Sequence, residues 1–206
     1  TAALTAQAVA VNFQSNAVPL EVRTRAANKL IAFSKLPVQS VFFVNSGAEA
    51  NENALKMAFT MNPGRTEVVA LEHSFHGRTA GAGALTWGAA KKWYGFPRTP
   101  FDVTFLPRRD EAALARITEK TAAVVVEPIQ GVGGFTIPPD GMLGALQEVL
   151  DEYGILYITD EVQTGWGRTG EHFWGYEAQH VRPDLLTFAK GLGNGLAMAG
   201  VIARGD

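Results

Sequence analysis

Several short stretches of this sequence combine charged or polar side chains with glycine just after a run of apolar residues. The last of them places Lys190 two residues after the run Leu185–Phe188. An amine at the mouth of a buried strand can lose its hydration, which favours the neutral, nucleophilic form. The alternative is a surface lysine whose stem lies on the protein while its charge stays in water. Lys190 is therefore a candidate nucleophile, and the residues around it decide between the two interpretations.

Two carboxylates also end apolar runs, Asp160 after Ile155–Thr159 and Glu127 after Ala123–Val126. A buried carboxylate needs a partner, and a protonated ring nitrogen would serve. Alternation along an extended chain places Val162 on the same side as Asp160, where it would pack on the ring face. The alternatives are a turn cap for Asp160 and a solvated charge for Glu127.

A capping box marks the start of one predicted helix. Ser46 is followed three residues later by Glu49, the pattern in which each side chain caps the backbone of the other. Unpaired N–H groups and the positive end of the helix dipole form an anion site there, and Gly47 lets the backbone approach a phosphate. The alternative is a plain helix cap without a ligand.

An aromatic side chain lies between two histidines in the stretch His73-Ser74-Phe75-His76-Gly77. Phe75 could stack flat on a heteroaromatic ring, or it could be a buried side chain in a polar turn. The two histidines suggest a metal pair, but no third ligand follows at a suitable spacing, so we predict no metal site.

The elements that must position these residues alternate between strands and helices. Strands are predicted at Val41–Val44, Val68–Leu71, Val103–Leu106, Ala123–Val126, Ile155–Thr159, Leu185–Phe188 and Met198–Ala203. Helices are predicted at Pro19–Ser34, Ala48–Thr60, Glu111–Glu119 and Met142–Tyr153. This order predicts an α/β fold with a mostly parallel sheet between two helical layers, a three-layer α/β/α architecture. Ligands of such sheets bind beyond the carboxyl ends of the strands.

The composition limits the class of protein. The chain has 206 residues, of which 47% are hydrophobic and 18% charged, so we expect one large domain over residues 1–206. Its first residue is threonine and its last residues follow an apolar run, so we interpret it as a segment of a longer protein. A net charge of −2 does not favour nucleic acid, and no apolar run is long enough for a membrane span. The lack of cysteine fits a reducing compartment, and we expect a cytoplasmic protein.

An anion cradle, a stacking aromatic, a carboxylate and a lysine together suit pyridoxal 5'-phosphate (PLP). The sequence resembles the class III aminotransferases, the ω-aminotransferase group of PLP fold type I, over nearly its whole length. The matching stretches are SGAEANENALKMA, HSFHGRT, EPIQGVGG, DEVQTGWGRTG and PDLLTFAKGLGNG. The resemblance implies a fold type I large domain and a homodimer with active sites at the interface. It also implies transfer of an amino group from an amino acid or ω-amine to pyruvate, glyoxylate or 2-oxoglutarate.

The resemblance also implies roles for individual residues. Lys190 would hold PLP as a Schiff base and move a proton between the substrate carbon and the cofactor. Asp160 would keep the pyridine nitrogen protonated, and Gln163 would hydrogen-bond the phenolic oxygen. Val162 and Phe75 would sandwich the ring. The phosphate would lie at Gly47 and Ala48, with Glu127, His76 and Ser46 as neighbours of the cofactor.

Two positions depart from the family's pattern. Val132 stands where several members, including those acting on γ-aminobutyrate and ornithine, carry a glutamate that pairs with an arginine, which favours the alanine–glyoxylate or β-amino-acid branches. Trp166 replaces a more usual phenylalanine and is expected to alter the pocket wall. The family's substrate-binding arginine, and the threonine that reaches the neighbouring subunit's phosphate, come largely after this segment.

Other functions remain open at this stage. A PLP-dependent decarboxylase or aminomutase of the same family would use the same residues. A non-catalytic cofactor-binding piece that needs a partner chain is a further alternative.

Overall fold

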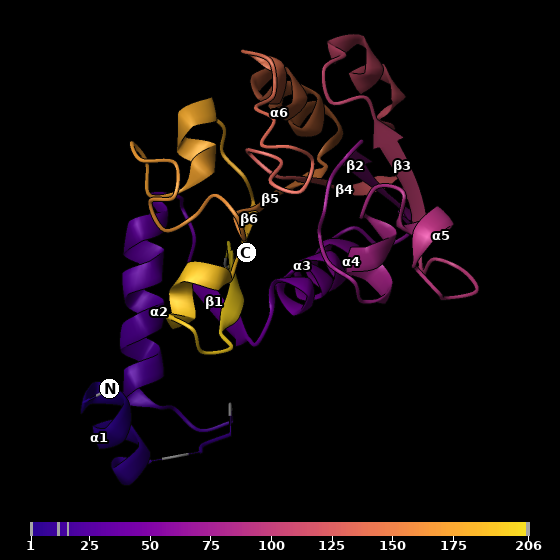
Figure 1. Cartoon of the computed structure of the whole chain (residues 1–206). Coiled ribbons are helices and arrows are strands. Elements are labelled where there is room, and N and C mark those ends of the chain that lie inside the picture. Colours follow the sequence, from indigo (N-terminus) through magenta and orange to yellow (C-terminus); the bar gives the residue numbers. More distant parts are fainter. Residues whose placement is uncertain (1, 12, 16, 205–206) are drawn as a thin grey trace.

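The computed structural model describes residues 2–11, 13–15 and 17–204. The strands in this part of the chain form a seven-stranded sheet. The strands are β1 (Ser40–Val44), β2 (Glu67–Leu71), β3 (Asp102–Leu106), β4 (Thr121–Val126), β5 (Leu156–Asp160), β6 (Leu185–Phe188) and β7 (Ala199–Ala203). Their order is β1-β7-β6-β5-β4-β2-β3 (Figure 1). Only β7 runs antiparallel to its neighbours, β1 and β6. All seven predicted strands are confirmed, with ends that differ by two residues at most.

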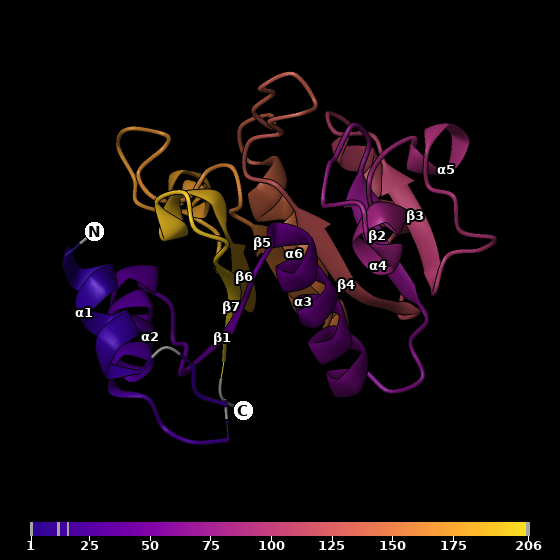
Figure 2. The same ribbon diagram turned by 60° about the horizontal axis from the view of Figure 1, so that its bottom comes forward.

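Helices cover both faces of the sheet, which confirms the three-layer prediction. Helix α3 (Gly47–Met61) packs Ala54 and Ala58 against one face, where Val125 belongs to the same cluster. Helix α6 (Met142–Tyr153) and α2 (Glu21–Ser34) bury apolar side chains in a second cluster that contains Val124 and Val126. Neighbouring residues of β4 thus face opposite layers, as the period of two in a strand requires. Helices α3 and α6 lie on opposite sides of the sheet (Figures 1 and 2).

The helices differ from prediction more than the strands do. The predicted helix at Glu111–Glu119 is wrong in type and length, because residues Glu111–Arg116 form a 3-10 helix, η1. The Asp110 side chain caps its start by accepting from the Ala112 N–H, and the chain becomes extended at Ile117, whose side chain is buried. The helix thus ends before Ile117, three residues earlier than predicted.

Several short elements were not predicted. Helix α1 (Ala2–Ala10) buries no side chain, so it has no apolar stripe, and α4 (Ala80–Ala84) is only five residues of alanine and glycine. Helix α5 (Ala89–Lys92) and the 3-10 helices η2 (Gly175–Gln179) and η3 (Lys190–Gly193) are too short to show a period. No helix in the described part of the chain is long and apolar enough to cross a membrane.

Candidate active site

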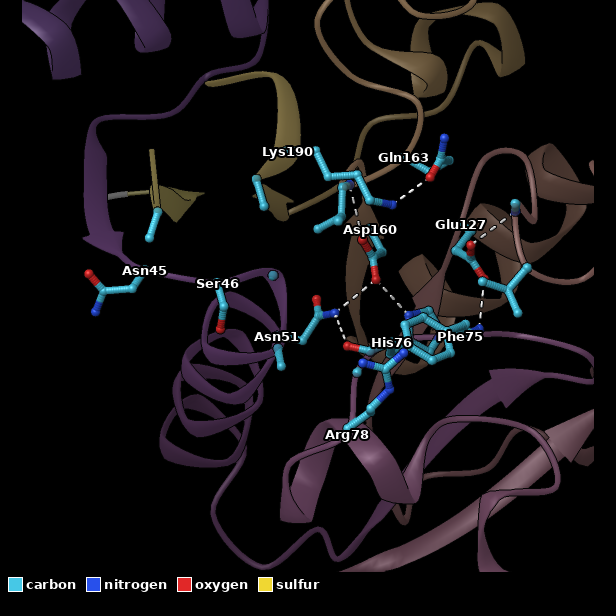
Figure 3. A pocket seen from close by; sticks show the side chains of 18 of the residues that line it. Asn45, Ser46, Asn51, Phe75, His76, Arg78, Glu127, Asp160, Gln163 and Lys190 are labelled. Atoms are coloured by element: carbon cyan, nitrogen blue, oxygen red, sulfur yellow. Dashed lines mark hydrogen bonds and ion pairs between the residues drawn. The ribbon is translucent and has the colours of Figure 1, made fainter. Parts of the chain in front are cut away.

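All ten site residues predicted from the sequence line one cavity of about 360 Å³. It lies beyond the carboxyl ends of β4, β5 and β6 and beside the start of α3 (Figure 3). Parallel α/β sheets place ligands at this edge. The residues are Ser46, Gly47, Ala48, Phe75, His76, Glu127, Asp160, Val162, Gln163 and Lys190.

The start of α3 forms the predicted capping box. The Glu49 N–H donates to Ser46 Oγ at 3.2 Å, and Glu49 Oε2 accepts from the backbone N–H groups of Asn45 and Ser46 at 2.8 and 2.9 Å. These bonds lower the pKa of Glu49, and the bond from the Asn45 N–H has the largest effect. Among the hydrogen bonds of the described residues, none uses the N–H of Gly47 or Ala48. Both groups point from a helix start and are available to an anion.

Gly47 is also required by packing inside the protein. A Cβ at this position would lie 2.9 Å from Val162 Cγ2 and 3.0 Å from Val162 Cγ1. The start of α3 therefore packs directly on the side chain that follows β5. Because Gly47 has no side chain, the N–H groups of the anion site lie directly beside the Val162 side chain in the cavity wall.

Asp160 is the last residue of β5 and is buried. Its Oδ2 accepts a hydrogen bond from Asn51 Nδ2 at 2.8 Å and lies 2.7 Å from His76 Nδ1 (Figure 3). Its Oδ1 accepts from the Val162 N–H at 3.1 Å. The two interpretations of Asp160 are thus compatible, because one oxygen caps a turn while the other belongs to a buried polar network.

His76 is completely buried beside this carboxylate. Burial lowers the pKa of His76, but the hydrogen bond and negative charge of Asp160, together with the charge of Glu127, outweigh that effect and raise it. Its Nε2 has no hydrogen-bond partner within the described residues. A protonated His76 therefore places positive charge next to Asp160.

Glu127 follows β4 and is buried, so the alternative of a solvated charge is wrong. Burial, opposed by the charge of His76 and reinforced by that of Asp160, raises the pKa of Glu127 to about 7. The N–H groups of Phe75 and Gly131 donate to its two oxygens at 2.9 and 3.3 Å. Glu127 can therefore exchange a proton near neutral pH.

Lys190 begins η3, and its Nζ donates to Gln163 Oε1 at 2.5 Å (Figure 3). Its backbone has φ +41°, a left-handed conformation that a non-glycine residue adopts only under constraint. The strand before it is buried, but the side chain of Lys190 itself is exposed. Of the two interpretations that the sequence left open for Lys190, the described chain thus shows the exposed one.

The cavity is also lined by three polar residues that were not predicted as site residues, Asn45, Asn51 and Arg78. Asn51 follows Gly47 by four residues, so helical spacing alone places the two on one face of α3. Arg78 has its guanidinium carbon 5.6 Å from the centre of the Phe75 ring, a cation–π contact. Phe75 is half-buried, as a stacking surface requires.

The two histidines of the predicted turn point to different places. His73 does not line the cavity, and its ring centre lies 5.9 Å from that of Trp87. Among the described residues, no group of three or more His, Cys, Asp or Glu side chains could hold a metal ion.

Comparison with known proteins identifies the family. The sequence model of the family described as Aminotransferase class-III matches residues 1–206. The chain belongs to the class III aminotransferases. An acetylornithine aminotransferase from Streptomyces clavuligerus is 44% identical over 204 residues, which is 98% of this chain and 50% of that protein. Another from Streptomyces coelicolor is 49% identical over 167 residues, 80% of this chain and 40% of that protein.

Solved structures of aminotransferases share the fold. The ornithine aminotransferase from Toxoplasma gondii superposes with a TM-score of 0.89 at 31% identity, over 98% of this chain and 50% of that one. The taurine:2-oxoglutarate aminotransferase from Bifidobacterium kashiwanohense, solved with PLP and glutamate, gives a TM-score of 0.86 at 32% identity, over 99% and 51%. The chain thus spans about half the length of the class III aminotransferases it matches.

The two departures from the class III pattern have different positions. Val132 lines the cavity and is 72% exposed. Trp166 does not line it but borders a smaller pocket of about 180 Å³ together with Gln163 and Lys190, and its indole packs against Gly191.

Proposed function

We propose that the full-length protein containing this chain is a PLP-dependent class III aminotransferase, with residues 1–206 as its PLP-binding large domain. It would move an amino group from an amino acid or amine to a keto acid such as pyruvate, glyoxylate or 2-oxoglutarate. The observation that carries this proposal is one cavity that joins the free N–H groups at Gly47 and Ala48, the buried Asp160 network and the Lys190 amine.

The described residues fit PLP in charge and in shape. The start of α3 offers two N–H groups and a helix dipole to a phosphate. Both oxygens of Asp160 take part in hydrogen bonds within the protein, so these contacts set the orientation of the carboxylate in the cavity. Phe75 and Val162 supply the apolar surfaces that a flat ring needs. When bound, PLP supplies an aldehyde that reacts with amines and a ring that withdraws electrons.

Each residue then has a separate task. Lys190 Nζ would attach the cofactor and carry a proton to or from the substrate carbon, and Gln163 Oε1 holds that nitrogen in place. Asp160 would hold a proton on the ring nitrogen. The hydrogen bond between His76 Nδ1 and Asp160 Oδ2 fixes the orientation of that carboxylate. Glu127, with a pKa of about 7, would lie beside the cofactor near the substrate.

The proposed donor carries a terminal amino group on an acylated amino acid. Relatives between 42% and 49% identical are named acetylornithine aminotransferases, which supports this class over the alanine–glyoxylate and β-amino-acid branches inferred from Val132. Neither the decarboxylase and aminomutase alternatives nor the non-catalytic piece is favoured by these relatives. A homodimer and a cytoplasmic location complete the proposal.

The test of the cofactor assignment uses the full-length protein loaded with PLP. We expect a visible absorbance band and a covalently fixed cofactor after borohydride reduction, and Lys190→Ala should abolish both. Lys92→Ala, an exposed lysine outside the cavity, is the control and should keep both. Fixed cofactor in the Lys190→Ala protein would contradict the assignment.

The substrate class is tested by following the visible band after adding a single amino donor. N-acetylornithine should convert the bound cofactor to its amine form faster than alanine or β-alanine. The acceptors pyruvate, glyoxylate and 2-oxoglutarate should then restore the band at different rates. Release of carbon dioxide from the donor would favour a decarboxylase instead.

A further inference from the structure

The indole of Trp166 is hydrogen-bonded to the backbone next to Lys190. Trp166 Nε1 donates to the Ala189 carbonyl at 2.8 Å, and the same carbonyl accepts from the Leu192 N–H at 3.2 Å. The second bond closes the first turn of η3. The carbonyl before Lys190 is therefore held both by its own turn and by a side chain from the distant loop after β5.

The same indole packs on the backbone after Lys190. A Cβ at Gly191 would lie 2.7 Å from Trp166 Cδ1 and 2.8 Å from Trp166 Cγ, so only glycine permits this contact. Trp166 thus contacts the chain on both sides of Lys190, by a hydrogen bond at Ala189 and by packing at Gly191.

Both residues have backbone conformations that need support. Lys190 has φ +41° and Trp166 has φ +68°, left-handed values that are uncommon for residues with a Cβ. Such conformations persist only where surrounding contacts impose them. The Trp166 ring lies in an aromatic cluster with Phe173, Trp174 and Phe188, with centroid distances of 5.6, 5.1 and 5.8 Å. Because Phe188 is the last residue of β6, the cluster ties the indole to the strand that leads to Lys190.

We infer that Trp166 is a positioning residue that fixes the backbone of Lys190, and with it the direction from which Nζ enters the cavity. The inference rests on the proposed function, in which Lys190 carries the cofactor. A phenylalanine at this position would keep the ring contacts but could not donate to the Ala189 carbonyl. The substitution Trp166→Phe therefore removes the hydrogen bond and keeps most of the packing.

Trp174 provides a matched control within the same cluster. It is fully buried, and its Nε1 donates to the Phe33 carbonyl at 3.0 Å. Trp174→Phe therefore removes the same kind of bond from a neighbouring indole and leaves the bond from Trp166 to the Ala189 carbonyl in place. Any general loosening of the cluster should occur in both variants.

The first measurement is hydrogen exchange in the cofactor-free full-length protein. Trp166→Phe should speed exchange in residues 186–196 markedly more than Trp174→Phe does, because only the first variant loses the hydrogen bond to the Ala189 carbonyl. The second uses the PLP-loaded protein, where Trp166→Phe should lower kcat about three- to tenfold with KM little changed, because one neutral hydrogen bond is lost. The visible circular dichroism per unit of absorbance should fall in the same variant, because a less fixed lysine orients the cofactor less uniformly.

Identical exchange, kcat and circular dichroism in the two variants would overturn the inference. If Trp166→Phe does not fold, Gly191→Ala tests the same contact, since its Cβ must displace the indole; unchanged exchange and circular dichroism would then overturn it. Failure of the proposed function is separate, because the wild-type protein would then show no visible band at all.

Discussion

The side-chain amide of Asn51 donates to the Asp160 carboxylate and to the backbone carbonyl of His76, each at 2.8 Å. Its Oδ1 accepts from Thr187 Oγ1, also at 2.8 Å. One buried amide on α3 therefore ties together β5, β6 and the turn that carries His76. The three partners also fix which side of the amide is oxygen and which is nitrogen.

Replacing this amide should cost stability. Asn51→Ala leaves the Thr187 hydroxyl and the His76 carbonyl buried without this partner, and we expect a loss of about 1–3 kcal/mol in the free energy of unfolding. Denaturant unfolding of the cofactor-free full-length protein measures it. Asn53→Ala is the control, because Asn53 is half-buried and its side chain donates only to the Glu49 carbonyl of its own helix at 2.8 Å. Equal losses in the two variants would show that the network does not stabilise the fold.

The site could be predicted where chemistry and local pattern coincide. Asp160, Glu127 and Lys190 each follow an apolar run, and the ends of parallel strands meet at one edge, so their convergence needs no tertiary knowledge. Ser46 and Glu49 are three residues apart, and this short pattern is enough to predict the start of the helix.

The remaining features depend on contacts between distant parts of the chain. Asn51 is separated by 25, 109 and 136 residues from its three partners, and Trp166 by 23 residues from Ala189. A short stretch of sequence, such as one helix or one turn, does not contain both members of such a pair. The sequence left the exposure of Lys190 and the burial of Glu127 open for the same reason, since each depends on which parts of the chain cover the strand end.

Asp160 should control turnover more than cofactor attachment. Asp160→Asn keeps the size of the side chain but removes the charge next to the ring nitrogen, so the visible band should persist while kcat falls about ten- to a hundredfold, the range for a charge-assisted hydrogen bond. Absorbance and steady-state rates on the PLP-loaded protein measure both. Undiminished kcat would exclude the proposed role of Asp160.

Gly47 should be intolerant of even one added methyl group. Gly47→Ala places a Cβ 2.9 Å from Val162, and the resulting overpacking should cost about 1–3 kcal/mol of unfolding free energy and weaken PLP binding. Gly144→Ala is the matched control, because Gly144 is the third residue of α6 and a Cβ there would meet no atom of the described residues within 4 Å. That variant should gain about 0.4–1 kcal/mol. Stabilisation by both substitutions would mean that the start of α3 can move away from Val162 at no cost.

Stability of the cofactor-free protein should fall as pH rises from about 5 to 7. Burial raises the pKa of Glu127 from 4.5 to about 7, so within this window the unfolded chain releases a proton that the folded protein keeps. His76 acts in the same direction, because its raised pKa gives stability at low pH that is lost as the histidine deprotonates. Glu161, whose pKa burial raises to about 6, adds to the lower part of the window.

Glu127→Gln isolates one contribution to this dependence, since an amide oxygen can still accept from the Phe75 N–H but does not titrate. Its unfolding free energy, measured by denaturant between pH 5 and 8, should decline less steeply than that of the wild type, by up to about 1.4 kcal/mol per pH unit. Glu148→Gln, an exposed position on α6, should reproduce the wild-type slope. If Glu127→Gln also reproduced it, Glu127 would titrate alike in the folded and unfolded states, and its burial would have no effect on its proton.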